Sequence, residues 1–457
     1  MLNDFIIIDK NKKSPFYRQI YLSVRKAIEN GSLQKGTKMP SIRRLCQDLS
    51  VSKTTITSAY EQLCVEGYIK NIPQSGYYVE AEFDSLPKSI KAETSDKTEH
   101  NKFYEYDFSG KSIDENIINI SQWKKCVKDV INQNYLLTSY GDEQGEIKLR
   151  NALQKYSLGT RSVNTKAENI IVGAGTQPLL YLLCTMLGEN KKVAMADSSY
   201  VQSELVFKSF GYEINYFKSD KFGVTVDSLD NIMPNIILIN PNFTVKSGAN
   251  MPVNRRIEII NWAKQNNALI IEDDYNGELR YITRPMSCVQ NYDTENTVYL
   301  GSFSKVLLPS VRISYMVLPN KLIDIYKSIK HMTNQTASKT EQLALAQYIE
   351  SGKIDSHLRK ARRTYLEKSK IMLDSINKYF NKSCKIIFNE TSLYASIVIS
   401  NVQDRKKIND ALEKNSVAVI PYNQNGSKFS ASFSGISQDK IEPGIALLAK
   451  IIYGFSD

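Results

Sequence analysis

A polar stretch of about two dozen residues, 81–105, separates two parts of the sequence that have different patterns. It reads "AEFDSLPKSIKAETSDKTEHNKFYE", with many charges, a single proline and little apolar periodicity. Loops of this length are uncommon inside a compact domain, so the stretch is expected to be a linker. The length of 457 residues also favours more than one domain. We predict an N-terminal domain at 1–80, the linker at 81–105 and a larger domain at 106–457.

The composition narrows the class of protein. The sequence contains no apolar run long enough for a membrane span and no signal-peptide pattern at its start, which predicts a cytoplasmic protein without a membrane partner. The six cysteines are scattered and none lies close to one of the three histidines, so structural thiols are expected and a metal site is not. The net charge of +11 is compatible with nucleic-acid binding but is weak support on its own.

The first eighty residues have the pattern of a winged helix-turn-helix. Apolar residues at helical spacing predict a helix that ends at Asn30-Gly31, a short helix opened by Ser41 and another that begins near Lys53. "YIKNIPQSGYYV" then alternates around a turn, as a small β-wing does. Hydroxyl side chains and a lysine at the start of the last helix suit contact with phosphates and base edges. A helical bundle with a solvated basic face is the alternative, and the turn and the wing argue against it.

Two stretches, "GSLQKGTKMPSIRRL" and "VSKTTITSAYEQLCVEGYI", resemble the winged-helix regulators of the GntR family. The resemblance implies that double-stranded operator DNA is the partner of this domain. It also implies which residues contact the DNA, in the helix-turn-helix and in the wing. These are Arg43, Ser52, Lys53, Thr54, Thr55, Ser75 and Gly76.

From about residue 106, short apolar strands alternate with amphipathic helices. The strands include "NIIVGAG", "KVAMAD", "NIILIN", "ALIIEDD", "TVYLGSF" and "RISYMVL". This alternation predicts an α/β fold with a mostly parallel sheet that is covered by helices on both faces. Ligands of such folds gather at the carboxyl ends of the strands, so the residues that follow each strand are the candidates for chemistry.

Three of these strand ends carry polar or aromatic groups. Gly175, Thr176 and Gln177 open a helix and can offer backbone N–H groups and a hydroxyl to a phosphate. Tyr200 follows another strand and can stack on a flat ring. "EDDYNGELRY" places consecutive carboxylates after a buried strand, and one buried acid can keep a ring nitrogen protonated. A solvated acidic loop and a magnesium site are the alternatives for that stretch.

A fourth strand end, "GSFSKVLLPSVRISY", contains one lysine, Lys305. Ser302 and Arg312 can hold a phosphate, and Lys305 between them can condense with an aldehyde on the same ligand. An S-x-x-K acyl-transfer site is an alternative whose companion motifs are absent from the sequence, and an exposed loop lysine is another. Taken together, the phosphate cradle, the stacking tyrosine, the acid and the lysine are what pyridoxal 5′-phosphate requires.

The motifs "YGDEQG", "GAGTQ", "IEDDYNGELRY" and "GSFSKVLLPSVRISYMVLP" make residues 106–454 similar to the fold-type I aminotransferases. Joined to a GntR-like domain, this part makes the chain resemble the MocR subfamily of bacterial regulators. The resemblance implies a large α/β domain, a smaller C-terminal α/β subdomain at about 330–457, and pyridoxal 5′-phosphate as cofactor. It also implies a homodimer of the head-to-tail, domain-swapped type, with sites at the subunit interface.

The same resemblance gives a role to each residue of the cofactor site. Lys305 would form the Schiff base, Tyr275 would meet the ring hydroxyl, and Asp273 would pair with the pyridine nitrogen, with Asp274 as the alternative. The other contacts would be Tyr200 on the ring, Gly175, Thr176, Gln177, Ser302 and Arg312 on the phosphate, and Tyr140 on the phosphate of the other subunit.

One departure from the resembled family changes the expected function. Aminotransferases of this fold hold the substrate carboxylate with an arginine, and Ser430 of "KFSASFSGIS" stands in its place, with Lys428 as a poorer substitute. A site without this clamp should bind and convert amino acids poorly. We therefore expect a regulator and no enzyme, most simply a vitamin B6 sensor of the PdxR type that controls genes for pyridoxal phosphate synthesis. The alternatives are a GabR-type regulator that answers an amine or amino acid, and a working aminotransferase with an added DNA-binding module.

Overall fold

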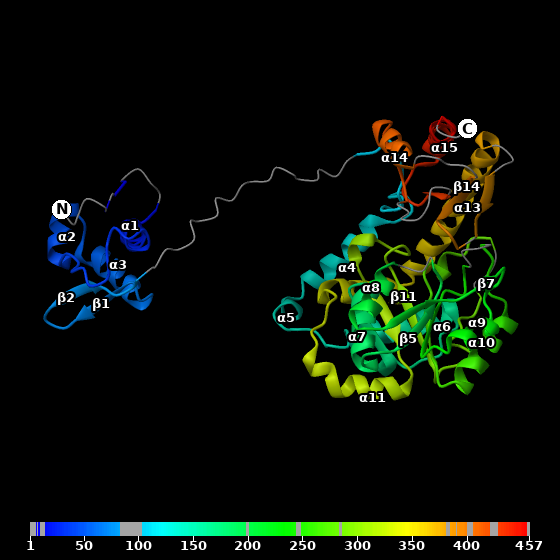
Figure 1. The fold of residues 1–457 in the computed structure, drawn as a ribbon, viewed down its shortest axis with the longest axis horizontal. Coiled ribbons are helices and arrows are strands. Elements are labelled where there is room, and N and C mark those ends of the chain that lie inside the picture. The colour runs from blue at the N-terminus through cyan, green and yellow to red at the C-terminus, as the bar shows by residue number, and fades with distance from the viewer. Residues whose placement is uncertain are drawn as a thin grey trace. The chain divides into compact units, whose positions relative to one another are not determined.

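The computed structural model divides the chain into two compact units, Met1–Lys102 and Phe103–Asp457, which are described separately (Figure 1). The structure describes residues 6, 8–9, 14–82, 103–197, 201–243, 248–282, 286–380, 384–389, 391–399, 405–420 and 428–454. In this part of the chain, no helix combines the length and apolar character needed to cross a bilayer, and no group of three or more His, Cys, Asp or Glu is placed to hold a metal ion. All six cysteines are free thiols.

The N-terminal unit is a winged helix-turn-helix, as predicted. It contains α1 (Phe16–Glu29), α2 (Ile42–Leu49), α3 (Lys53–Val65) and the antiparallel hairpin of β1 (Ile69–Ile72) and β2 (Gly76–Val79). Its core takes residues from every helix and from the hairpin, among them Ile20, Val24, Leu45, Ile56, Leu63 and Val79. The apolar stripes seen in the sequence therefore face one common core.

Hydroxyl side chains cap both helices of the helix-turn-helix. Ser41 Oγ accepts a hydrogen bond from Arg44 N at 3.3 Å, and Ser52 Oγ accepts one from Thr55 N at 3.2 Å. Ser50, in the turn between them, adopts the left-handed conformation with φ 51°. These caps satisfy N–H groups that the first turn of a helix leaves free, which fixes where each helix starts.

The second unit is built on a sheet with strand order β4-β12-β11-β10-β9-β5-β6. Its strands are β4 (Ile170–Gly173), β5 (Lys192–Met195), β6 (Glu213–Tyr216), β9 (Ile236–Ile239), β10 (Leu269–Asp273), β11 (Thr297–Ser302) and β12 (Ser314–Val317). β12 is antiparallel to both of its neighbours, and the other described pairings of this sheet are parallel. The predicted α/β fold with a mostly parallel sheet is thus confirmed.

Helices cover both faces of this sheet, because the side chains of each strand alternate between two cores. One core contains Ile271 and Leu300, and it packs against α7 (Thr176–Leu187), α8 (Val201–Ser209) and α11 (Asn320–Ile329). The opposite face packs against α4 (Ile120–Ile131), α6 (Ile147–Arg161), α9 (Val226–Ile232), α10 (Val253–Gln265) and α12 (Lys339–Glu350). Shorter elements are α5 (Asn134–Leu137), β7 (Ser219–Asp220), β8 (Gly223–Val224) and 3-10 turns at Ala167–Asn169, Gly277–Leu279, Pro309–Val311 and Lys330–Met332.

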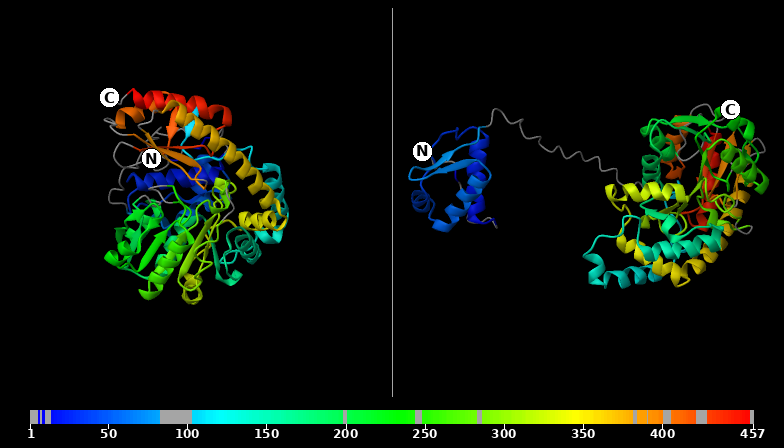
Figure 2. Two further views of the ribbon diagram at one scale, coloured as in Figure 1. Left: turned by 90° about the vertical axis from the view of Figure 1, so that its right-hand side faces the viewer. Right: turned by 90° about the horizontal axis from the view of Figure 1, so that it is seen from below.

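The described residues from 353 to 454 form a C-terminal layer, shown in gold, orange and red beside the green sheet in the left view of Figure 2. The layer contains α13 (Lys353–Tyr379), α14 (Arg405–Lys414), α15 (Gln438–Tyr453) and a sheet of β13 (Cys384–Ile387), β14 (Tyr394–Ile399) and β16 (Lys428–Ser432). Its β15 (Val417–Val419) pairs in parallel with β3 (Tyr106–Phe108). The first strand of the second unit, β3, is therefore part of the C-terminal layer.

Candidate functional site

Three segments that are far apart in the sequence meet at one edge of the large sheet. Because β12 runs antiparallel between β4 and β11, it begins at the edge where they end. The register places Gly173 opposite Ser314, and Ser314 opposite Ser302. The turn after β4, the end of β11 and Arg312 before β12 therefore converge at this edge.

Arg312 lies against the glycine that precedes α7. A Cβ built on Gly175 would stand 2.7 Å from Nη2 of Arg312, and Gly175 itself has φ +107°. Arg312 adopts the left-handed conformation with φ 51°, and its Nη1 donates to Ser304 Oγ at 3.3 Å. Thr176 is the first residue of α7, so the guanidinium lies beside a helix N-terminus, whose free N–H groups and dipole favour an anion.

Hydroxyl groups surround this cradle. Ser302 Oγ accepts hydrogen bonds from Ser314 Oγ at 2.9 Å and from Ser304 N at 3.3 Å. Thr336 Oγ1 accepts one from Ala174 N at 2.9 Å. These three neighbours were not predicted from the sequence. Ser304 and Ser314 lie within the sequence motif around Lys305, whereas Thr336 lies in no motif that marks it as a candidate.

The two adjacent aspartates at the end of β10 have different surroundings. Asp274 is buried, and its Oδ2 pairs with Arg161 Nε at 2.5 Å and accepts from Tyr299 Oη at 2.6 Å. Its Oδ1 accepts hydrogen bonds from Asn242 Nδ2 and, at 3.2 Å, from Arg161 Nη2. Asp274 is thus engaged in an internal network, and Asp273, the last residue of β10, is the carboxylate that this geometry favours for a ligand.

Burial perturbs the acids of this region. Burial, together with the neighbouring Asp274 carboxylate, raises the pKa of Asp273 to about 7. The same two causes raise the pKa of Glu272 to about 7, although its carboxylate accepts hydrogen bonds from Val289 N and Gln290 N at 2.8 and 2.9 Å. A cation placed next to Asp273 would favour its ionised form, which is the partnership a pyridinium nitrogen needs.

Lys305 lies in the loop between β11 and β12 and is half-buried. Burial lowers the pKa of Lys305, and the charge of Asp107 opposes this effect. Its Nζ donates a hydrogen bond to the carbonyl oxygen of Gly110, a residue that the sequence analysis did not single out. A lowered pKa increases the share of neutral amine, which is the nucleophilic form.

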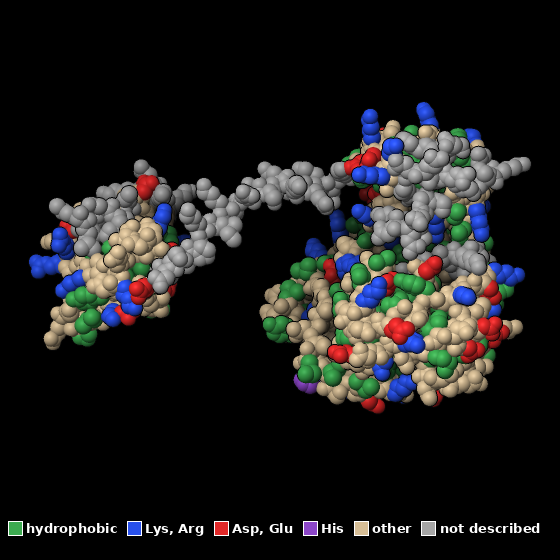
Figure 3. Space-filling model, viewed as in Figure 1, with side chains coloured by type: hydrophobic (Ala, Val, Ile, Leu, Met, Phe, Trp, Pro, Cys, Tyr) green, Lys and Arg blue, Asp and Glu red, His purple; other side chains and the backbone are tan. Residues whose placement is uncertain are grey.

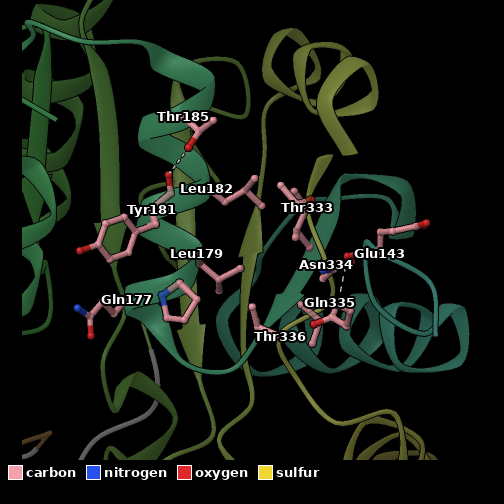
Figure 4. Close-up of a pocket in the computed structure, with 13 residues that line it drawn as sticks. Glu143, Gln177, Leu179, Tyr181, Leu182, Thr185, Thr333, Asn334, Gln335 and Thr336 are labelled. Carbon is pink, nitrogen blue, oxygen red and sulfur yellow. Dashed lines mark hydrogen bonds between the residues drawn. The ribbon is translucent and has the colours of Figure 1, made fainter. Parts of the chain in front are cut away.

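The remaining residues predicted to contact the cofactor lie at exposed positions, outside the described residues or beside a cavity. Tyr275 follows the two aspartates and is 41% exposed, Tyr140 is fully exposed, and Tyr200 lies outside the described residues. Gln177 lines a cavity of about 370 Å³ beside α7 (Figure 4). Figure 4 shows its amide directed away from Thr336, which lies across this cavity.

β16 presents a serine-lined face close to Gly110. Ser430, in the place expected for a carboxylate-binding arginine, is buried and its Oγ lies 2.7 Å from Ser396 Oγ. Side chains two residues apart on a strand share a face. Ser432 therefore lies on the same face, and a Cβ built on Gly110 would stand 3.1 Å from it. Lys428 is the cation on this face, and burial lowers its pKa while Asp197 opposes the shift.

In the N-terminal unit, most of the residues predicted to contact DNA gather at the start of α3. Ser52 Oγ lies 2.8 Å from the hydroxyls of both Thr54 and Thr55. Lys53 and Thr54 are exposed, as is Arg43 on α2. Figure 3 shows Lys and Arg side chains on the α2 side of this unit. The arrangement presents cations and hydroxyls next to a helix N-terminus, which suits a phosphate backbone.

The wing carries the other two predicted DNA contacts. Gly76 begins β2 with φ +109°, a conformation that favours glycine, and Ser75 Oγ lies 2.7 Å from Tyr78 Oη. Lys38 Nζ lies 5.6 Å from the centre of the Tyr78 ring and adds a cation that the sequence analysis did not identify.

Comparison with known proteins matches each unit to a family. Residues 16–79 match the bacterial regulatory proteins of the gntR family, and residues 106–445 match aminotransferase class I and II. The uncharacterized HTH-type transcriptional regulator YdeL of Bacillus subtilis is 32% identical over 95% of this chain and 96% of its own length. The HTH-type pyridoxine biosynthesis transcriptional regulator PdxR of Corynebacterium glutamicum is 25% identical over 88% of each chain. The probable rhizopine catabolism regulatory protein MocR of Rhizobium meliloti is 27% identical over 80% of this chain and 78% of its own.

Solved structures support the fold of the second unit. An archaeal alanine:glyoxylate aminotransferase superposes with a TM-score of 0.71 at 22% identity, covering 77% of this chain and 91% of its own. The Pyrococcus horikoshii kynurenine aminotransferase gives a TM-score of 0.70 at 21% identity, covering 78% of this chain and 92% of its own.

The residues at the sheet edge fit pyridoxal 5′-phosphate, the cofactor of the aminotransferase class I and II family. Arg312 and the α7 N-terminus would hold its phosphate, and Asp273 would lie at its ring nitrogen. When bound, this cofactor supplies an aldehyde to primary amines, and the half-buried amine of Lys305 lies in the same loop as Arg312.

The family matches of the two units, together with the similarity to HTH-type regulators over nearly the whole chain, identify the family. The chain belongs to the MocR-type transcriptional regulators of the GntR family, which join a helix-turn-helix domain to an aminotransferase class I and II domain.

Proposed function

We propose that this protein is a cytoplasmic regulator that binds operator DNA through residues 1–80 and responds to pyridoxal 5′-phosphate through residues 106–457. In this proposal, 81–105 is the linker and about 330–457 is the small subdomain. The observation that carries it is the lysine-and-phosphate cradle beside the serine-lined face of β16. The described face of β16 offers the hydroxyls of Ser430 and Ser432 where a guanidinium would hold a substrate carboxylate, which suits a receptor of the cofactor better than an enzyme.

Each residue has a role in this proposal. Lys305 forms the Schiff base, Asp273 pairs with the ring nitrogen and Tyr275 with the ring hydroxyl. The ring is stacked by Tyr200 and the phosphate is held by Gly175, Thr176, Gln177, Ser302 and Arg312. The operator is contacted by Arg43, Ser52, Lys53, Thr54, Thr55, Ser75 and Gly76.

The proposed effector is pyridoxal 5′-phosphate itself, so that the protein acts as a vitamin B6 sensor that controls genes for its synthesis. Ser430 supports this, because its hydroxyl is bonded to Ser396 and offers no charge to a carboxylate. A relative named for pyridoxine biosynthesis supports it as well. Lys428 favours a second candidate, a response to a small amine or amino acid, since it is a half-buried cation on the same face of β16.

The proposed assembly is a head-to-tail homodimer in which Tyr140 reaches the phosphate of the partner subunit. Tyr140 is fully exposed in the single chain, and Tyr135 and Leu137 nearby are 67% and 51% exposed. Figure 3 shows hydrophobic side chains gathered at the α5 end of the second unit. Exposed apolar patches of this kind mark interaction surfaces, which supports a partner at this end.

The central test is the absorbance of the purified protein with pyridoxal 5′-phosphate. Lys305→Ala should abolish the visible imine band, and Lys321→Ala should keep it, because Lys321 bonds to Asn296 Oδ1 at 2.7 Å on another part of the unit. A band that persists unchanged in Lys305→Ala would refute the assignment of Lys305.

Operator binding then separates the candidate effectors. The B6-sensor proposal expects pyridoxal 5′-phosphate alone to change operator affinity, with no further change from common amino acids. An affinity that ignores the cofactor and follows an amino acid would favour the second candidate. Transamination at ordinary enzyme rates, of about 1 to 10³ per second, would show that the protein is a working aminotransferase.

A further inference from the structure

The segment that follows the linker runs through the cofactor site. We call residues 106–117 the arm. Tyr106 N donates to Ser416 O at 3.1 Å where β3 pairs with β15. Phe108 is fully buried, and a Cβ built on Gly444 of α15 would stand 2.6 Å from its ring. The first part of the arm is therefore packed into the C-terminal layer.

The far part of the arm is fixed to the same layer. Asp114 N donates to Ser434 O at 2.8 Å, and Ser434 Oγ donates to Ser112 O at 2.8 Å. Asp114 Oδ2 pairs with Lys368 Nζ of α13 at 2.6 Å, and these side chains are only 11% and 0% exposed. Separating a buried ion pair is costly because it leaves each charge uncompensated. The arm and the C-terminal layer therefore behave as one body.

Between these two attachments, the arm touches the large sheet at the reactive lysine. The carbonyl oxygen of Gly110 accepts a hydrogen bond from Lys305 Nζ, and Lys305 belongs to the loop after β11. Gly110 has φ +71°, and a Cβ at this position would stand 3.1 Å from Ser432. The atom that contacts the arm, Lys305 Nζ, is thus the same nitrogen that is proposed to bond to the cofactor.

Condensation with an aldehyde changes what this nitrogen can donate. The neutral amine forms a C=N bond to the aldehyde carbon, and the carbonyl oxygen leaves as water with the two hydrogens of the amine. The resulting nitrogen has no N–H, or a single one whose direction is fixed by the plane of the C=N bond. Lys305 therefore cannot hold Gly110 as an ammonium does while it is bound to the cofactor.

We propose that the Lys305–Gly110 hydrogen bond is a latch between the large sheet and the arm, and that reaction of Lys305 with the cofactor opens it. Opening frees the arm and the C-terminal layer to shift together. Because the arm begins where the linker ends, the shift is passed to the linker that carries residues 1–80. An amine ligand that attacks the C=N carbon displaces Lys305 as a free amine, which allows the latch to close again. The latch rests on the function proposed above, since it needs a cofactor that reacts with Lys305.

Hydrogen exchange of the full-length protein tests the latch at the turn that holds Gly110. Ser109 N is bonded to Asp107 Oδ1 at 2.9 Å and Lys111 N to Ser109 Oγ at 3.3 Å, so both amides report on this turn. Pyridoxal 5′-phosphate should raise their exchange in the wild type by about tenfold, the size expected for losing one hydrogen bond to a charged group. Lys305→Ala without cofactor should reach the same level and show no further rise with it. Lys321→Ala should behave as the wild type. Wild-type exchange in Lys305→Ala would overturn the latch.

A second variant removes the buried ion pair that helps hold the far part of the arm to the C-terminal layer, without touching Lys305. Asp114→Asn/Lys368→Gln removes both charges of the buried pair, so neither is left uncompensated. It should keep the imine band of the wild type and reduce the response of operator affinity to pyridoxal 5′-phosphate, since the pairing of β3 with β15 and the backbone bond to Ser434 remain. An unchanged response would show that the arm is not the route. A wild type without an imine band would instead refute the proposed function, so the two failures are distinguishable.

Discussion

Nη2 of Arg312 lies where a side chain at position 175 would have to be, since a Cβ built on Gly175 would stand 2.7 Å from it. The two residues are brought together by the antiparallel β12, which begins beside the end of β4. A glycine at this position lets the guanidinium approach the backbone at the start of α7. The phosphate cradle therefore depends on a missing side chain as much as on the arginine.

Gly175→Ala is predicted to weaken binding of pyridoxal 5′-phosphate. The added Cβ displaces Arg312, and the φ of +107° is unfavourable for alanine. Losing a hydrogen bond to a charged group corresponds to roughly a ten- to hundredfold weaker affinity, measured by absorbance titration. Gly159→Ala is the matched control, because a Cβ at this helical glycine meets no atom within 4 Å. The control should bind the cofactor normally, and equal affinity of the two variants would contradict the cradle.

Asp273→Asn and Asp274→Asn are predicted to fail in different ways. Asp273→Asn should keep the fold and lower cofactor affinity by about tenfold or more, because it removes the charge offered to the ring nitrogen. Asp274→Asn leaves the buried Arg161 without its carboxylate, which should lower the free energy of unfolding by about 3–5 kcal/mol. Denaturant unfolding and absorbance titration of both variants check this. A stable Asp274→Asn with weak cofactor binding would reverse the assignment.

The stability of the protein without cofactor is predicted to depend on pH through Asp273. Its folded-state pKa of about 7 is above that of the unfolded chain, so the folded state binds the proton more tightly. The stability that this group contributes is present at low pH and is lost as pH rises from about 4 through 7, by at most about 1.4 kcal/mol per pH unit. Wild type should therefore lose more unfolding free energy between pH 5.5 and 8 than Asp273→Asn. Equal losses in the two proteins would count against an ionising Asp273.

Ser52→Ala is predicted to reduce both the stability of the N-terminal unit and its affinity for DNA. The change removes the cap on α3, which costs about 0.5–2 kcal/mol of stability, together with a hydroxyl assigned to the operator. Ser41→Ala is the matched control, since it removes the equivalent cap on α2. Thermal unfolding should show similar losses in both variants, whereas an operator titration should show a larger loss for Ser52→Ala. Equal losses of DNA affinity would argue that Ser52 acts only as a cap.

Much of the architecture could be predicted because it follows from local rules. The caps at Ser41 and Ser52, the alternating wing and the short apolar strands are each encoded within a few neighbouring residues. The motif from Ser302 to Arg312 holds its serine, lysine and arginine in one contiguous stretch, so the phosphate cradle could be proposed before its geometry was known.

Other features depend on contacts between residues far apart in the chain. The pattern "EDDY" places two aspartates side by side, and their different surroundings come from Arg161, which lies 113 positions from Asp274 and pairs with its carboxylate in the core. Gly110 carried no chemical signal, because a backbone carbonyl is common to every residue and only the fold brings this one to Lys305. The sequence by itself determined the two domain types and marked Lys305 as the candidate for the reactive lysine, since local spacing and residue chemistry define them. Only the tertiary structure decided that Asp274 pairs with Arg161 and that Lys305 touches Gly110, because packing brings distant segments into contact.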